Sequence, residues 1–406
     1  MGYSKQTLLF LFTTFPPEVS GSAQYNWDRV RWLAKQGQYI IVVLAPECRK
    51  GSSLPTVPPD LQKQLIIETY PSQNWLLYQL NRVPTLLAAK KIKQRIEYYQ
   101  PDLITVVDVE RLFWFSTWHL PGKKYANDNH IPYITEYHTD YYQMSSTYPL
   151  GKLLGEIIFK HITGYLYRQF DLIVTVSAAA SRSLKLLGLS DFHQIQMYGI
   201  DTSKFSPNRR NRKHLEKWLS PEQYEHKVLL FLGRLSPEKR IELLIQAFKR
   251  LLDKHQKLCL LIAGDGPVEF VNQLKHITKT IPNIHFTGFV HKEAKANLLA
   301  SCDVYCSPAP YETFGLSVVE AMASGVPVVT VNSGGVSDYL IDEINAYLVI
   351  PDDLESLTNA IDKSLSRDNT VIVKQALQDT HSLSIEQCCQ NLNSFYKQLL
   401  CTTTVT

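Results

Sequence analysis

The chain reads YETFGLSVVEAMASGVPVV over residues 311–329. Two glutamates in this stretch, Glu312 and Glu320, enclose seven residues. A helix that begins near Gly315 would start with unpaired backbone amides and the positive end of its dipole, which together favour a diphosphate. Glu312 would then stand before the helix, placed to meet a sugar, and Glu320 inside it, placed to meet a ribose diol. The alternative for Glu320 is a solvated helical side chain.

On both sides of this stretch, short apolar runs alternate with helical patterns, which is typical of parallel sheets with crossover helices. The strands expected in the N-terminal half are 8–13, 40–44, 65–68, 103–107, 133–136, 172–176 and 195–198. Those expected in the C-terminal half are 227–232, 258–263, 284–286, 304–306, 328–331 and 347–350. The sequence therefore predicts an α/β protein with two Rossmann-like, doubly wound domains.

Chain length and composition place the domain boundaries. A chain of 406 residues is too long for one compact core and suits two domains of about 150 to 200 residues. The polar stretch 201–226 is interpreted as a linker that ends in a short helix. It separates an N-terminal domain, 1–200 completed by a helix at about 382–400, from a C-terminal domain, 227–381. Ligands bind beyond the carboxyl ends of parallel strands, so we expect an inter-domain cleft lined by strand-to-helix loops.

Charge and cysteine content narrow the class of protein. A net charge of +4 is too small for a nucleic-acid partner. The seven cysteines form no Cys-x-x-Cys pair, so reduced structural thiols are expected rather than zinc ligands. The first apolar run ends at Pro16-Pro17 without a cleavage-like site, and no run reaches the ~20 apolar residues of a membrane span. These features predict a cytoplasmic protein, either free or peripheral on a membrane face.

A second motif, Gly233-Arg234-Leu235-Ser236-Pro237-Glu238-Lys239, directly follows an apolar strand. Its two cations, Arg234 and Lys239, are placed to neutralise a diphosphate together. Ordinary surface charges are the alternative interpretation.

The stretch 311–329 resembles the Glu-x7-Glu signature of glycosyltransferase family 4, whose members have the GT-B fold, and almost the whole chain fits. The resemblance implies that Glu312 lies near the donor sugar and that Glu320 holds the ribose hydroxyls. It also implies backbone contacts to the donor from Phe314, Gly315 and Leu316. The loops 263–267 and 286–290 resemble the family's loops near the base, which brings Val290 to the nucleoside.

Three positions depart from the family pattern. Arg240 stands where the family usually has a glycine, which puts the local turn in doubt. Tyr198 replaces an asparagine near the domain hinge, so hinge or acceptor contacts are expected to differ. Ser20-Gly21 replaces two adjacent glycines, and Gly21 keeps a close backbone approach to the donor phosphates available. The loop at Gly21 is no Gly-x-Gly-x-x-Gly fingerprint, which argues against a nicotinamide enzyme.

A histidine, His138, follows the strand expected at 133–136. A lone histidine in such a place is more often structural than catalytic. The resemblance implies instead that His138 and Glu312 are catalytic, with His138 contacting the donor sugar and helping to shape the reacting centre. The form Tyr137-His138-Thr139 and the aromatic stretch 141–143 are similar to the branch that contains sulfolipid synthase and other glycolipid or mannosyl transferases.

Together with the motif residues, the resemblance implies a retaining transferase that moves a hexose from a UDP- or GDP-sugar to a hydroxyl acceptor, a lipid or lipid-linked glycan. A soluble metabolite or polysaccharide acceptor, and an inactive nucleotide-sugar-binding protein, are the alternatives. No cofactor and no metal are expected. The run Asp108-Val109-Glu110 is similar to a metal-binding Asp-x-Asp, but it follows a strand in a different architecture.

The composition of the window 75–97 predicts a lipid-binding surface on the N-terminal domain. It carries five basic residues against Glu97 alone: Arg82, Lys90, Lys91, Lys93 and Arg95. Its aromatic start, Trp75-Leu76-Leu77-Tyr78, adds apolar groups beside the cations. Such a mixture suits an interfacial helix on anionic lipid. A solvated face on a helix that packs on the core is the alternative.

Overall fold

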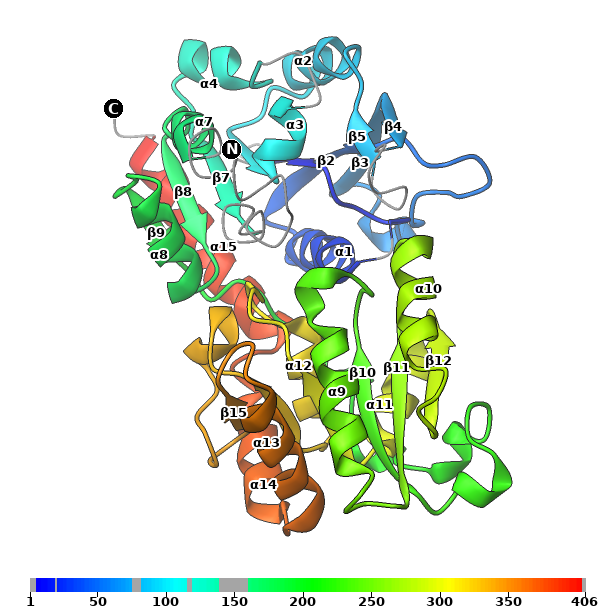
Figure 1. The fold of residues 1–406 in the computed structure, drawn as a ribbon. Helices are drawn as coiled ribbons and strands as arrows, with labels where there is room; N and C mark the ends of the chain where they lie inside the picture. The colour runs from blue at the N-terminus through cyan, green and yellow to red at the C-terminus, as the bar shows by residue number, and fades with distance from the viewer. Residues whose placement is uncertain (1–4, 19, 75–81, 115–118, 139–159, 404–406) are drawn as a thin grey trace. The chain divides into compact units, whose positions relative to one another are not determined.

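A computed structural model of the protein describes residues 5–18, 20–74, 82–114, 119–138 and 160–403 (Figure 1). The chain divides into two compact units. The first is Met1–Tyr198 together with Ile385–Thr406, and the second is Gly199–Ser384.

The first unit is built on a parallel sheet in the order β3-β2-β1-β6-β7-β8-β9. Its central strands are mostly apolar and buried, as expected where helices cover both faces of a sheet. The strands are β1 (Gln6–Phe12), β2 (Tyr39–Pro46), β3 (Leu65–Tyr70), β6 (Leu103–Val107), β7 (Tyr133–Tyr137), β8 (Leu172–Thr175) and β9 (Phe192–Gln194). A small antiparallel hairpin, not expected from the sequence, pairs β4 (Ser72–Asn74) with β5 (Arg82–Pro84).

The α-helices described in this unit are α1 (Gly21–Lys35), α2 (Ala88–Tyr99), α3 (Val109–Trp114), α4 (Lys123–Asn129), α7 (Lys160–Tyr167), α8 (Ala178–Leu186) and α15 (Ile385–Thr403); one 3₁₀ turn is η1 (Pro59–Leu61). Helix α1 begins where Ser20 adopts an extended backbone and its Oγ accepts the Ala23 amide at 3.1 Å. The cap sets the helix start at Gly21. The C-terminal helix α15 packs against α1.

One predicted strand is wrong. The run 195–198 was expected to join the sheet because it is apolar, but the last strand is β9, which ends at Gln194. The backbone carbonyls of 196–198 accept hydrogen bonds from side chains instead. The donors are Asn391 to Gln196, Tyr25 to Met197 and Cys388 to Tyr198. Helices α1 and α15 therefore hold this segment in place of a neighbouring strand.

The second unit holds a parallel sheet in the order β12-β11-β10-β13-β14-β15. Its strands are β10 (Lys227–Leu232), β11 (Leu258–Ala263), β12 (Ile284–Gly288), β13 (Val304–Ser307), β14 (Val328–Val331) and β15 (Tyr347–Val349). Its helices are α9 (Ile241–Leu251), α10 (Val268–Ile277), α11 (Lys292–Ser301), α12 (Leu316–Ala323), α13 (Leu354–Ser366), α14 (Thr370–Asp379) and the 3₁₀ turns η7 (Pro237–Lys239) and η8 (Gly334–Asp338). Helix α9 buries Ile241, Leu244, Ile245 and Phe248, one stripe at helical spacing, in the core of this unit.

The stretch expected as a linker lies on the second unit. It forms four 3₁₀ turns: η3 (Thr202–Lys204), η4 (Pro207–Arg209), η5 (Arg212–Leu215) and η6 (Pro221–Gln223). Arg210 and Arg212 pair with the two oxygens of Asp303, at 2.6 and 3.0 Å. The basic residues of this stretch thus fasten it to the loop before β13. The two doubly wound sheets confirm the predicted fold class.

Candidate functional site

The second sheet reverses its strand order between β10 and β13, and two predicted site residues meet there. Lys239 lies in the loop after β10 and Glu312 in the loop after β13. Lys239 Nζ lies 2.5 Å from Glu312 Oε1, and each side chain is a little under one-fifth exposed. A crevice beyond the strand ends at such a reversal is the usual ligand site of an open α/β sheet.

The other predicted cation, Arg234, pairs with Glu238 within the same loop. Arg234 Nη2 lies 2.9 Å from Glu238 Oε1, and Ser236 Oγ donates to the same oxygen at 2.6 Å. Burial acts to raise the pKa of Glu238, but the Arg234 guanidinium and the Ser236 hydroxyl hold this pKa below its ordinary value. Glu238 is therefore a buried anchor that keeps the more exposed Arg234 at the edge of the loop.

Arg240, where the family usually has glycine, keeps the turn that glycine would make. Its φ is 54°, in the left-handed region. This conformation costs a residue with a side chain about 1 kcal/mol. Arg240 Nε lies 2.5 Å from Asp352 Oδ1, which compensates part of that cost. The departure from the family pattern therefore leaves Lys239 in place.

Helix α12 begins at Leu316, as the sequence predicted. Gly315 caps it with a φ of 81°, and a Cβ there would lie 2.6 Å from Val336 Cγ1. Phe314 is buried, and its carbonyl accepts the Tyr339 hydroxyl at 2.6 Å. The first amides of a helix have no intrahelical acceptor, so those that follow Gly315 are suited to an anion.

Sequence reasoning missed the loop that supports Glu312. Gly335, after β14, donates its amide to the Glu312 carbonyl at 2.6 Å. A Cβ at Gly335 would lie 1.8 Å from the Thr313 carbonyl oxygen. The two adjacent glycines at 334–335, which begin three residues after the predicted strand 328–331, were the available signal.

A second residue that the sequence did not indicate is Lys295 on α11. Its Nζ lies 2.5 Å from Oε1 of Glu320 on α12. The carboxylate expected to hold a ribose is thus paired with a lysine 25 residues away. No local sequence pattern predicts that Lys295 pairs with Glu320.

The remaining predicted residue of this unit, Val290, is half-buried between β12 and α11. Its loop is tied to the neighbouring ones, since Gly264 donates its amide to the Gly288 carbonyl at 3.0 Å. Leu235 in turn donates to the Asp265 carbonyl at 2.9 Å. The loops after β10, β11 and β12 therefore form one connected edge.

In the first unit, His138 directly follows β7 and is enclosed by protein groups. Its Nδ1 lies 2.8 Å from the Tyr198 hydroxyl and its Nε2 lies 2.7 Å from Glu136 Oε2, with the side chain 1% exposed. Tyr198, the departure from asparagine, thus contacts the predicted catalytic histidine. Contact of His138 with a sugar stays a prediction, as does donor contact of Gly21, which is exposed at the start of α1. Residues 139–143 lie outside the described residues.

The acidic pair after β6 is buried and bound to hydroxyls. Asp108 Oδ2 accepts the Thr14 hydroxyl at 2.9 Å, and Glu110 Oε1 accepts the Tyr167 hydroxyl at 2.8 Å. Burial raises the pKa of Glu110 to about 8. Across the described parts of the chain, no group of three or more His, Cys, Asp or Glu side chains is arranged to hold a metal ion.

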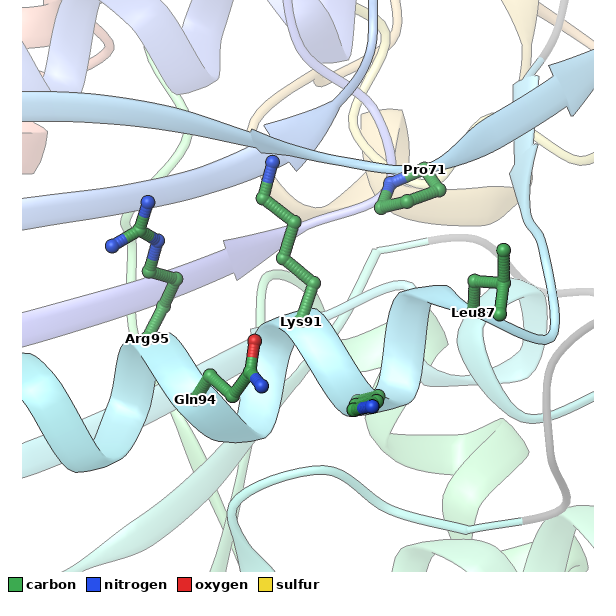
Figure 2. Close-up of a pocket in the computed structure, with 6 residues that line it drawn as sticks. Pro71, Leu87, Lys91, Gln94 and Arg95 are labelled. Atoms are coloured by element: carbon green, nitrogen blue, oxygen red, sulfur yellow. The ribbon is translucent and has the colours of Figure 1, made fainter.

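Helix α2 carries the described part of the predicted basic window; residues 75–81 lie outside it. Ala88, Ile92 and Ile96 face the core. On the opposite face lie Leu87, Lys90, Lys91, Gln94 and Tyr98, which we call the α2 stripe. Leu86 beside it, Leu87 and Tyr98 are each at least 70% exposed. A pocket on this helix is lined by Pro71, Leu87, Lys90, Lys91, Gln94 and Arg95 (Figure 2).

The cations of α2 differ in their partners. Arg95 Nε lies 2.5 Å from Glu68 Oε2, and Lys93 Nζ lies 3.8 Å from Glu97 Oε1. Lys90 and Lys91 have no ion-pair partner among the residues that the structure describes. The uncompensated charge of α2 therefore belongs to the α2 stripe. None of the helices described is long and apolar enough to span a bilayer.

Comparison with known proteins gives two family matches. The family model for glycosyl transferases group 1 matches residues 213–376, and the model for glycosyltransferase family 4 matches residues 19–204. A sulfoquinovosyl transferase of Arabidopsis thaliana is 27% identical over 93% of this chain and 71% of that protein. A GDP-mannose-dependent alpha-(1-6)-phosphatidylinositol dimannoside mannosyltransferase of Mycobacterium tuberculosis is 33% identical over 44% of this chain and 45% of that protein.

Among solved structures, HepE of Anabaena in complex with UDP and glucose has a TM-score of 0.72 at 20% identity. The match covers 96% of this chain and 99% of HepE. At that identity the likeness establishes the fold, which is GT-B.

Proposed function

This chain belongs to glycosyltransferase family 4, and from that premise we propose that it is a retaining hexosyltransferase that uses a UDP- or GDP-sugar and a lipid acceptor. The observation that carries the proposal is the meeting of Lys239 with Glu312 beside the start of α12. The cation and the start of the helix suit the diphosphate end of a sugar diphosphate, and the carboxylate suits its sugar end.

The chemistry follows from the charges that develop as the sugar leaves its diphosphate. Negative charge grows on the leaving group, where Arg234, Lys239 and the first amides of α12 stabilise it. Lys239 has three donors, of which Glu312 takes one, so it can hold a phosphate oxygen and the carboxylate together. The acceptor hydroxyl attacks the anomeric carbon from the face that the diphosphate leaves and passes its proton to an oxygen of the departing phosphate, which retains the anomeric configuration. These groups of the chain neutralise the leaving diphosphate, a role that a divalent ion would otherwise fill.

The test is incubation with UDP-glucose, UDP-galactose and GDP-mannose against lipid extracts and soluble sugars, read by mass spectrometry. We expect a glycosylated lipid whose yield is unchanged in excess EDTA. Loss of activity in EDTA that magnesium or manganese restores would contradict metal independence. Donor binding without any transfer across the acceptor panel would favour an inactive nucleotide-sugar-binding protein.

Two observations support a lipid acceptor. One of the relatives above is named for phosphatidylinositol dimannoside. The second is the α2 stripe, where lysines lie between exposed apolar side chains on one face of an amphipathic helix. Anionic headgroups attract the lysines while Leu87 and Tyr98 enter the interface. We propose that this face rests on an anionic bilayer, with the enzyme at the cytoplasmic side.

Lys90→Gln with Lys91→Gln is expected to weaken binding to vesicles of phosphatidylglycerol and phosphatidylcholine by about 2 kcal/mol, roughly thirtyfold, at about 1 kcal/mol per lysine. Liposome flotation at low salt measures it. Lys275→Gln with Lys279→Gln removes the same charge from the second unit and should leave flotation unchanged. Wild-type protein that does not float, or equal flotation of both double variants, would rule out the α2 stripe as the contact.

A further inference from the structure

The pairing of Glu320 with Lys295 is partly open to solvent. Helix α11 packs against α12. The Lys295 side chain is 28% exposed and the Glu320 side chain 12%. Phe205 lies on another side of the lysine, with its ring centroid 5.4 Å from Nζ. The ammonium is thus held by a charge and by an aromatic face.

The pair offers a ligand both an acceptor and a donor. Lys295 contacts Oε1 of Glu320, while a carboxylate has a second oxygen and accepts several hydrogen bonds. An ammonium has three donors, and Glu320 takes one of them. Each hydroxyl of a ribose diol both donates and accepts. A donor fixed beside an acceptor therefore matches a diol more fully than a carboxylate alone.

We propose that Lys295 is a specificity-determining residue for the nucleoside part of the donor. It orients the Glu320 carboxylate and donates to a ribose hydroxyl, so that the site selects ribonucleotides over 2′-deoxyribonucleotides. The inference rests on the proposed function, because it takes the ligand to be a nucleotide sugar. Selection arises because a missing hydroxyl leaves polar groups of the site unpaired.

Calorimetry on the full chain tests this with UDP, GDP, their 2′-deoxy counterparts and inorganic pyrophosphate. Wild-type protein should prefer the ribonucleotide. Lys295→Met keeps the apolar stem and should lose about tenfold in affinity for the ribonucleotide, the value of one hydrogen bond to a charged group. Its affinity for the 2′-deoxynucleotide should fall less than that for the ribonucleotide, and its affinity for pyrophosphate should stay at the wild-type level. In the Glu320→Gln background, Lys295→Met should add little.

Lys275→Met is the matched control, because Lys275 Nζ also lies over a phenylalanine ring in the same unit, 6.0 Å from the centroid of Phe286. It should bind all probes as wild type does. Unchanged ribonucleotide affinity in Lys295→Met, a wild type that does not discriminate, or an equal loss for all probes would overturn the role of Lys295 and leave the transferase standing. Wild-type protein that binds neither UDP nor GDP would overturn the proposed function and this inference together.

Discussion

Replacing Arg234 and Lys239 together by alanine is expected to remove nearly all transfer. Under the proposed function, each cation makes charge-assisted hydrogen bonds to the diphosphate that strengthen as the leaving group gains charge. Each loss should cost about 1.5 to 3 kcal/mol, so additive losses lower kcat/KM by roughly 10²- to 10⁴-fold. Steady-state kinetics of both single variants and the double variant, on the donor that the screen identifies, measure the effect.

Arg240→Ala supplies the control for that experiment, since it removes a neighbouring cation that pairs with exposed Asp352. It should keep kcat/KM within a small factor of wild type. Lys239→Ala also unpairs Glu312, so a thermal melt of each variant is needed to separate donor binding from stability. A folded double variant with wild-type kinetics would remove both cations from the site.

Arg29→Met is expected to destabilise the first unit by about 3 to 5 kcal/mol, because it removes the guanidinium that neutralises the buried Glu136 carboxylate and leaves the His138 ring as its close neighbour. Arg29 Nη1 lies 2.7 and 2.9 Å from the two carboxylate oxygens, and the side chains are 0% and 1% exposed. The guanidinium also lies about 5 Å from the ring centroids of Phe12 and Tyr25. Urea unfolding at neutral pH measures the loss.

The pH dependence of stability provides a second test of the Arg29→Met variant. Burial acts to raise the pKa of Glu136, but Arg29, and after it His138, hold this pKa below its ordinary value. A depressed carboxyl pKa contributes stability above the unfolded pKa that is lost as the pH falls through the folded pKa. Without Arg29 that pKa should rise, so the deficit of Arg29→Met should shrink as the pH is lowered. Arg29→Met with Glu136→Met should regain most of the stability, and a double variant as weak as the single one would contradict the buried-charge explanation.

The sequence by itself determined the two sheets and the start of α12. Strands buried on both faces appear as continuous apolar runs, so β6, β10, β11 and β14 have the predicted bounds. Gly315 takes a positive φ before the helix, a requirement that depends on a few adjacent residues. Local backbone preference was sufficient for these features. The run 195–198 was wrongly predicted as a strand, because its apolar residues indicate burial but not strand pairing. Its backbone carbonyls accept hydrogen bonds from side chains of α1 and α15.

Only the tertiary structure decided the partners of the charged side chains. Lys239 meets Glu312 across 73 residues, Lys295 meets Glu320 across 25, and Arg29 meets Glu136 across 107. Such pairs depend on which loops lie together at one edge of a sheet and on which helices pack together. The spacing of residues within a motif predicts neither. Motif residues could therefore be named from the sequence, while the neighbours that orient Glu320 and enclose His138 came from the packing of distant segments.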